Sequence, residues 1–113
     1  MKLAQKEERG VIILQLSGKI MGGPDASTIN DLLHELIESN KPHVVVDMSQ
    51  VEWMNSSGLG ILIGGVTTLR NNGGDLKLAC ATKKIQDLLV ITKLQSVFES
   101  FDQIEDAVAS FQK

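Results

Sequence analysis

Two adjacent serines, Ser56 and Ser57, have the clearest chemical potential in this chain. They follow an apolar β-branched run that ends at Asp47 and precede apolar residues at helical spacing, so a helix should begin there. A serine at a helix start can cap a free backbone N–H. It can also accept a phosphate, which the positive end of the helix tolerates. Because Gly58 leaves space around the second hydroxyl, Ser57 should be accessible and a phosphate there would be tolerated, with capping as the alternative.

A third use of Ser57, as the nucleophile of an enzyme, has little support. Such a serine needs a nearby base, and His34 and His43 belong to other segments, where we expect them on the surface. Cys80 ends an apolar segment and should be a buried, inert thiol. Asp47 should accept hydrogen bonds from the loop that follows it. Without a His and Cys cluster at metal-ligand spacing, we expect no metal, no cofactor and no enzymatic activity.

Length and charge indicate a single domain and argue against a nucleic-acid-binding or membrane-spanning protein. The 113 residues fit one domain, residues 1–113. The net charge is −3 and the lysines are scattered, so the basic surface of a nucleic-acid-binding protein is missing. No apolar run approaches the roughly 20 residues of a membrane span, and the first ten residues lack the apolar core of a signal peptide. We therefore expect a cytoplasmic protein without membrane insertion, as a monomer or weak dimer.

Periodicity divides the chain into strands and helices. Gly23 and Pro24 suit the cap and the first position of a helix. Asp102 and Glu105 form a capping-box pattern before the last helix. The expected strands are 2–6, 11–20, 43–48, 76–80 and a short strand or extended segment within 96–101. The expected helices run from 24 to about 39, from about 56 to 69, over 83–93, and onward from residue 102.

Strands that alternate with helices after an initial hairpin predict a single α/β domain with a mixed sheet of four to five strands and about four helices. The run 43–48 lacks polar alternation, so we expect it at the centre of the sheet, covered on both faces. Residues 49–56 should then form a loop at the carboxyl end of this strand. In such sheets, ligands and partners bind at that end.

The predicted second helix and its loop hold further candidates. Gly60 and Gly64 lie four residues apart on one helix face and should allow another backbone to approach closely. Ile61 lies off the apolar stripe and is expected to be an exposed contact beside Ser57. Trp53 is interpreted equally well as a partner contact or as a lid over the core. Lys83 and Lys84, at the start of the third helix, should be solvated.

The segment VVVDMSQVEWMNSSGLGIL, residues 44–62, resembles the signature of the STAS domain, the family of bacterial anti-sigma-factor antagonists. In that signature an aliphatic strand ending in Asp leads through an aromatic residue and a Ser-Ser-Gly triplet into a helix. The similarity extends to LQLSGKI, residues 14–20, and to residues 76–111. It therefore covers nearly the whole chain, and the fold that it implies agrees with the predicted α/β sheet.

The resemblance implies a partner switch. A serine kinase that is also the anti-sigma factor would phosphorylate Ser57, the serine before the glycine. Unphosphorylated protein would bind the kinase and free the sigma factor, phosphorylated protein would dissociate, and a serine phosphatase would reset the switch. Residues expected to contact the partner are Met21, Trp53, Asn55, Ser56, Gly58 and Ile61.

Two positions depart from the family pattern. Asn55 stands where many phosphorylated members have Asp, and Met21 or Gly22 stands where many have an acidic residue. Asn55 can still cap the helix, and it leaves the site less negative. The alternative function is an unphosphorylated STAS scaffold, or an accessory subunit of a transport or signalling complex, in which Ser57 only caps.

Overall fold

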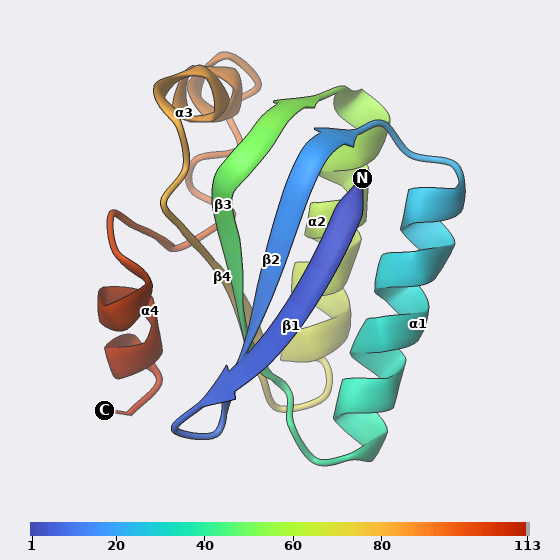
Figure 1. Ribbon diagram of the computed structural model, residues 1–113, viewed down its shortest axis with the longest axis vertical. Coiled ribbons are helices and arrows are strands. Elements are labelled where there is room, and N and C mark those ends of the chain that lie inside the picture. The colour runs from blue at the N-terminus through green and yellow to red at the C-terminus, as the bar shows by residue number, and fades with distance from the viewer. Residues whose placement is uncertain (113) are drawn as a thin grey trace.

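The computed structural model describes residues 1–112, which form one five-stranded sheet flanked by four helices (Figure 1). The strand order is β1-β2-β3-β4-β5; β1 is antiparallel to β2, and the other neighbouring pairs are parallel. This confirms the predicted α/β fold with a mixed sheet and a central third strand. The strands are β1 (Lys2–Glu8), β2 (Val11–Ile20), β3 (His43–Met54), β4 (Asp75–Ala79) and β5 (Ser100–Phe101). The helices are α1 (Pro24–Glu38), α2 (Ser56–Arg70), α3 (Lys83–Ile91) and α4 (Ile104–Ser110).

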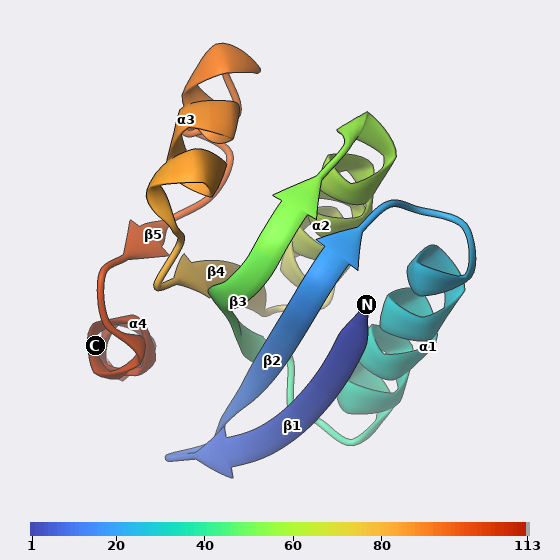
Figure 2. The ribbon, with the colours of Figure 1, turned by 45° about the horizontal axis from the view of Figure 1, so that its top comes forward.

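Alternating side chains of the sheet build two apolar layers, because successive residues of a strand point to opposite faces. Ile12 and Leu14 of β2 join the larger core, which includes the buried sides of α1 and α2. Val11 and Ile13 join a smaller cluster with α4 on the other face. Figure 2 shows α1 and α2 together on one side of the sheet and α4 on the other. The run Val44–Met48 of β3 is buried throughout, as its unbroken apolar pattern predicted.

The first hairpin and β3 are both longer than predicted. β1 continues to Glu8, and a two-residue turn at Arg9 and Gly10 follows, with φ of 52° and 79°. Positive φ at both positions matches the twist of a tight hairpin. The predicted loop 49–56 is mostly strand, because β2 continues beside β3 as far as Met54. Two register shifts along β2 interrupt the regular pairing, which is why a simple alternation was not visible.

The predicted capping box before the last helix is wrong. Gln103 is the N-cap of α4 and makes no side-chain capping bond. Asp102 therefore lies one position too early to pair with Glu105 across the first turn. By contrast, Gly23 and Pro24 start α1 as predicted, and Thr82 caps α3 by accepting a hydrogen bond from the Ile85 N–H at 3.3 Å.

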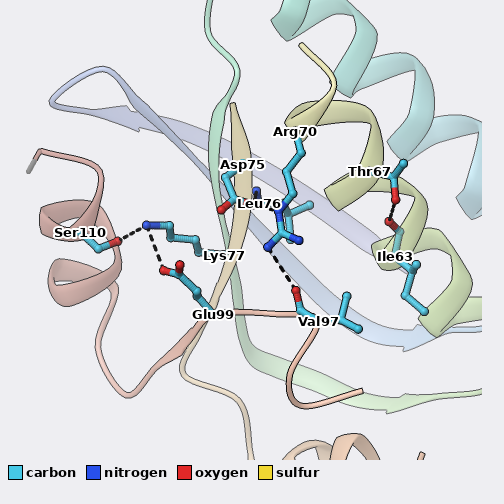
Figure 3. A network of polar contacts seen from close by, with 9 residues as sticks. All are labelled: Ile63, Thr67, Arg70, Asp75, Leu76, Lys77, Val97, Glu99 and Ser110. Atoms are coloured by element: carbon cyan, nitrogen blue, oxygen red, sulfur yellow. Dashed lines mark hydrogen bonds and ion pairs between the residues drawn. The ribbon is translucent and has the colours of Figure 1, made fainter. Parts of the chain in front are cut away.

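Polar contacts tie the later elements together (Figure 3). Arg70, at the end of α2, donates to the Asp75 carboxylate at 2.9 Å and to the Val97 carbonyl at 3.2 Å. Lys77 of β4 is buried, and its ammonium lies 2.7 Å from the Ser110 hydroxyl and 3.2 Å from Glu99. These contacts hold the loop before β5 and helix α4 against the sheet.

Replacing Lys77 by methionine is expected to change the free energy of unfolding by less than about 1 kcal/mol, although the ammonium is buried. Glu99 is 57% exposed to water, and Ser110 still donates to the Ala107 carbonyl, so neither needs the charge. The ammonium also lies 4.2 Å from the Phe111 ring centroid, where the sulfur of methionine can make a favourable contact in its place. Chemical denaturation would measure the change. Lys77→Ala is the control, since it also removes the buried aliphatic stem and should cost about 2 kcal/mol or more. Equal losses in both variants would contradict this account.

Candidate functional site

The candidate site lies where β2 and β3 end side by side. The two strands are parallel neighbours, and Ile20 pairs with Met54 at their carboxyl ends. The chain leaves β2 through residues 21–23 into α1, and it leaves β3 through Asn55 into α2. The Asn55 N–H donates to the Ile20 carbonyl at 3.4 Å, which brings the two exits together. This is the edge at which partners engage in sheets of this type.

Asn55 is the residue that organises the junction. Its side-chain oxygen accepts a hydrogen bond from the Gly58 N–H at 2.8 Å and so caps α2. Its side-chain N–H₂ donates to the Met21 carbonyl at 3.1 Å. The prediction that Asn55 can cap is therefore confirmed, and the alternative in which Ser56 or Ser57 caps is wrong, because both serines lie inside the first turn of α2. One amide thus starts the helix and holds the neighbouring loop.

The Ser57 side chain is exposed, and within residues 1–112 no hydrogen bond to its hydroxyl is found. The backbone of Gly22 lies directly against it: a Cβ added at Gly22 would be 2.8 Å from the Ser57 Cβ. Gly22 has φ of +91°, a conformation that side-chain-bearing residues rarely adopt. The loop thus packs on one side of Ser57, and the residue stays exposed to solvent. The Ser57 hydroxyl makes no helix-capping hydrogen bond, so it is available for modification.

Among the glycines of α2, Gly58 lies against another backbone, whereas Gly60 and Gly64, which were expected to do so, do not. A Cβ at Gly58 would lie 2.0 Å from the Ile20 carbonyl oxygen, so this position is glycine because the β2 backbone passes there. Gly60 and Gly64 have nothing within 4 Å of an added Cβ, and the predicted close approach of another backbone is wrong. They border a shallow hollow of about 310 Å³ between α1 and α2. Ile61 also lines this hollow and is half-buried, not exposed as expected.

The remaining predicted contacts surround the junction. Met21 is 46% exposed. Trp53 is half-buried, and the Lys84 ammonium lies 5.1 Å from its ring centroid, within cation–π range. Lys84 therefore has a role that the sequence did not indicate. The structure brings Met21, Asn55, Ser57 and Gly58 together, whereas Trp53 and Ile61 lie before and beyond them along the chain.

Asn55→Ala is expected to lower the free energy of unfolding by about 1–2 kcal/mol, because it removes the cap of α2 and the tie to Met21. Asn55→Asp should cost less, since a carboxylate still caps but cannot donate to the Met21 carbonyl. Urea denaturation of the three proteins would measure the order. If the aspartate variant were as unstable as the alanine variant, the cap would not be the main contribution of this residue.

Other polar candidates have structural roles. Asp47 is buried and accepts a hydrogen bond from the Ser49 N–H at 3.0 Å, as predicted. Cys80 is half-buried, whereas a fully buried thiol was expected. Burial raises the pKa of this thiol, and the nearby carboxylates of Asp47 and Asp102 raise it further. A raised pKa keeps the thiol protonated and poorly nucleophilic.

The two histidines cannot serve Ser57 as a base. His34 is exposed in the second half of α1, whose first turn is the end near the site. His43 begins β3, a 12-residue strand whose other end leads to Ser57, and its ring stacks on Phe111 at 4.7 Å instead of lying free on the surface. Over residues 1–112 no group of three or more His, Cys, Asp or Glu side chains could hold a metal ion. Within the same residues, none of the helices has the length and apolar character of a membrane span.

Comparison with known proteins gives a consistent family match. The family model of the STAS domain matches residues 2–107. The anti-sigma F factor antagonist of Paenibacillus polymyxa is 22% identical over 113 residues, covering 99% of this chain and 96% of the relative. Both matches extend over nearly the whole chain.

Solved structures share the fold. An anti-sigma-factor antagonist (STAS) domain protein from Planctomyces limnophilus superposes with a TM-score of 0.80 at 15% identity, covering 98% of each chain. The phosphorylated form of the Bacillus cell fate determinant SpoIIAA superposes with a TM-score of 0.73 at 15% identity, covering 97% of this chain and 99% of that one. At these identities the superpositions show a common fold.

Proposed function

Because this chain belongs to the STAS domain family, we propose that it is an anti-sigma-factor antagonist that binds an anti-sigma factor with serine kinase activity. The contact surface is the junction of Met21, Asn55, Ser56, Ser57 and Gly58, with Trp53 and Ile61 at its margins. The observation that carries the proposal is the exposed Ser57 hydroxyl, which no capping bond occupies because Asn55 caps α2. A kinase can reach such a hydroxyl without unfolding the helix.

Phosphorylation of Ser57 would act as the off signal. A phosphate adds roughly −1.5 to −2 charges at neutral pH. The first turn of α2 contains no acidic residue, and its free N–H groups favour an anion, so the folded chain tolerates the charge. A partner surface fitted to a neutral hydroxyl does not tolerate it, because the charge must be desolvated and the phosphate is bulky. Gly22 has no side chain to crowd a phosphate on Ser57, whose Oγ would lie 3.6 Å from a Cβ at that position.

A serine phosphatase would restore the binding form, and the cycle would run in the cytoplasm. Asn55 fits this cycle because its neutral amide adds no negative charge beside the phosphoacceptor. The donor bond from Asn55 to the Met21 carbonyl also gives the amide a structural reason to replace the acid found in many phosphorylated members, since a carboxylate could not make it.

The first test is site mapping by intact-mass and peptide mass spectrometry on protein taken from its native host under several growth conditions. A single phosphate on Ser57 that varies with condition is the expected result. Pull-down with the unmodified protein, and with Ser57→Ala as a form that cannot be phosphorylated, should then capture the same ATP-binding kinase. A chain that is unmodified in every condition, with a partner that is never released by ATP, would overturn the switch and favour the permanent scaffold.

A further inference from the structure

The outer strand β1 leaves one edge of the sheet open. In residues 1–112 β1 pairs only with β2, and six of its seven side chains are exposed, Leu3 being the exception. Figure 2 shows β1 at the border of the sheet, beyond β2. Its pairing with β2 runs without a register shift, and it contains no proline. A regular strand of this length presents a row of backbone donors and acceptors to another strand.

Basic residues lie toward the start of β1 and acidic residues at its end, so two antiparallel copies of the strand can place opposite charges against each other. Lys2 and Lys6 stand in the first part of the strand, and Glu7 and Glu8 at its end. When two copies of β1 run antiparallel with their Gln5 residues opposite each other, Lys2 of each copy faces Glu8 of the other. Shifting the register by two residues in either direction places Lys2 opposite Lys6, or Lys6 opposite itself. Opposite charges stabilise a cross-strand pair and like charges destabilise it, so one register is favoured.

We propose that β1 pairs antiparallel with β1 of a second copy in this register and forms a two-fold dimer with one continuous sheet. Lys2 and Glu8 are available for the contact, because neither belongs to an ion pair within residues 1–112. Glu7 already pairs with Lys41 at 2.7 Å, so its charge is balanced where it would face Leu3 of the second copy. A pair of single strands forms a small interface, and the dimer is therefore weak and concentration-dependent.

One face of the sheet beside β1 is open. Helix α4 covers β3 and β4, and the neighbouring part of the same sheet face is an open hollow of about 500 Å³. Its lining includes Lys2 and Ala4 of β1 with Gln15 and Ser17 of β2. None of the residues around Ser57 belongs to β1. The pairing therefore uses no residue of that site, and the inference stands independently of the proposed function.

Sedimentation velocity on the full chain over a range of concentrations tests the pairing. The variants are Lys2→Glu and Glu8→Lys, each of which places like charges opposite each other at both ends of the two-fold interface. An equimolar mixture of the two variants regains both opposite-charge pairs in a heterodimer. Glu38→Lys, at the exposed end of α1, is the control for the same change in net charge as Glu8→Lys.

Wild type and Glu38→Lys are expected to associate alike, while each single variant associates at least about tenfold more weakly. The mixture should recover association close to that of the wild type. A wild-type chain that stays monomeric up to about 1 mM would overturn the proposal. Association of the wild type that neither variant weakens, or that the mixture does not restore, would place the contact elsewhere and overturn it as well.

Discussion

Gly58→Ala is expected to lower the free energy of unfolding by about 3 kcal/mol or more, the largest loss expected of any one-methyl change in α2. The new Cβ would lie 2.0 Å from the Ile20 carbonyl oxygen and 2.9 Å from its carbon. Both belong to backbone, and that carbonyl also accepts the Asn55 N–H, so neither side can move without losing the cap or the end of β2. Thermal and urea denaturation would measure the loss.

Gly64→Ala is the matched control for this prediction. It makes the same chemical change on the same helix, at an exposed position where nothing lies within 4 Å of the added methyl. Alanine restricts the unfolded chain and has the higher helix propensity, so this variant should be stabilised by about 0.5–1 kcal/mol. Opposite signs for the two variants are the expected result. A Gly58→Ala protein as stable as wild type would show that the junction of β2 and α2 is loosely packed.

The fold was predictable because its strongest signals are local. The unbroken apolar run 43–48 marked the central strand, and Gly23 with Pro24 marked the start of α1. The errors fall where tertiary contacts decide. Residues 49–54 have no clear alternation, and they are strand because β2 continues beside them through two register shifts. The Asp102 and Glu105 pattern was a plausible cap, but α4 begins after Gln103.

The site was predictable in its location and less so in its roles. Asn55, Ser56 and Ser57 are three consecutive good capping residues, and local propensity cannot choose among them. The structure favours Asn55 because only its amide can both accept from Gly58 and donate across to the carbonyl of Met21. That donor bond depends on a loop 34 residues earlier in the chain, which no local pattern reveals.

Phosphorylation of Ser57 is expected to weaken binding to the captured kinase partner on the order of 100-fold, because a double negative charge must be buried where a neutral hydroxyl fitted. The fold should be kept. Asn55 already caps α2, and the Ser57 hydroxyl holds no bond that modification would break, so the helical circular-dichroism signal of the phosphorylated chain should match that of the unmodified chain. Calorimetric titration of both forms with the purified partner gives the ratio of affinities.

A variant at Ser56 is the control that shows whether the partner responds to a charge at position 57 itself or to any charge at the start of α2. Ser56 is also exposed and lies in the same first turn, whereas Ser57 is the serine whose Cβ would be 2.8 Å from a Cβ at Gly22. Ser57→Asp should reproduce part of the loss of affinity, and Ser56→Asp should bind at least about tenfold more tightly than Ser57→Asp. If both variants lost affinity equally, the partner would respond to the overall charge at the start of α2. If phosphorylated protein bound as tightly as unmodified protein, Ser57 would not be the residue that switches partners.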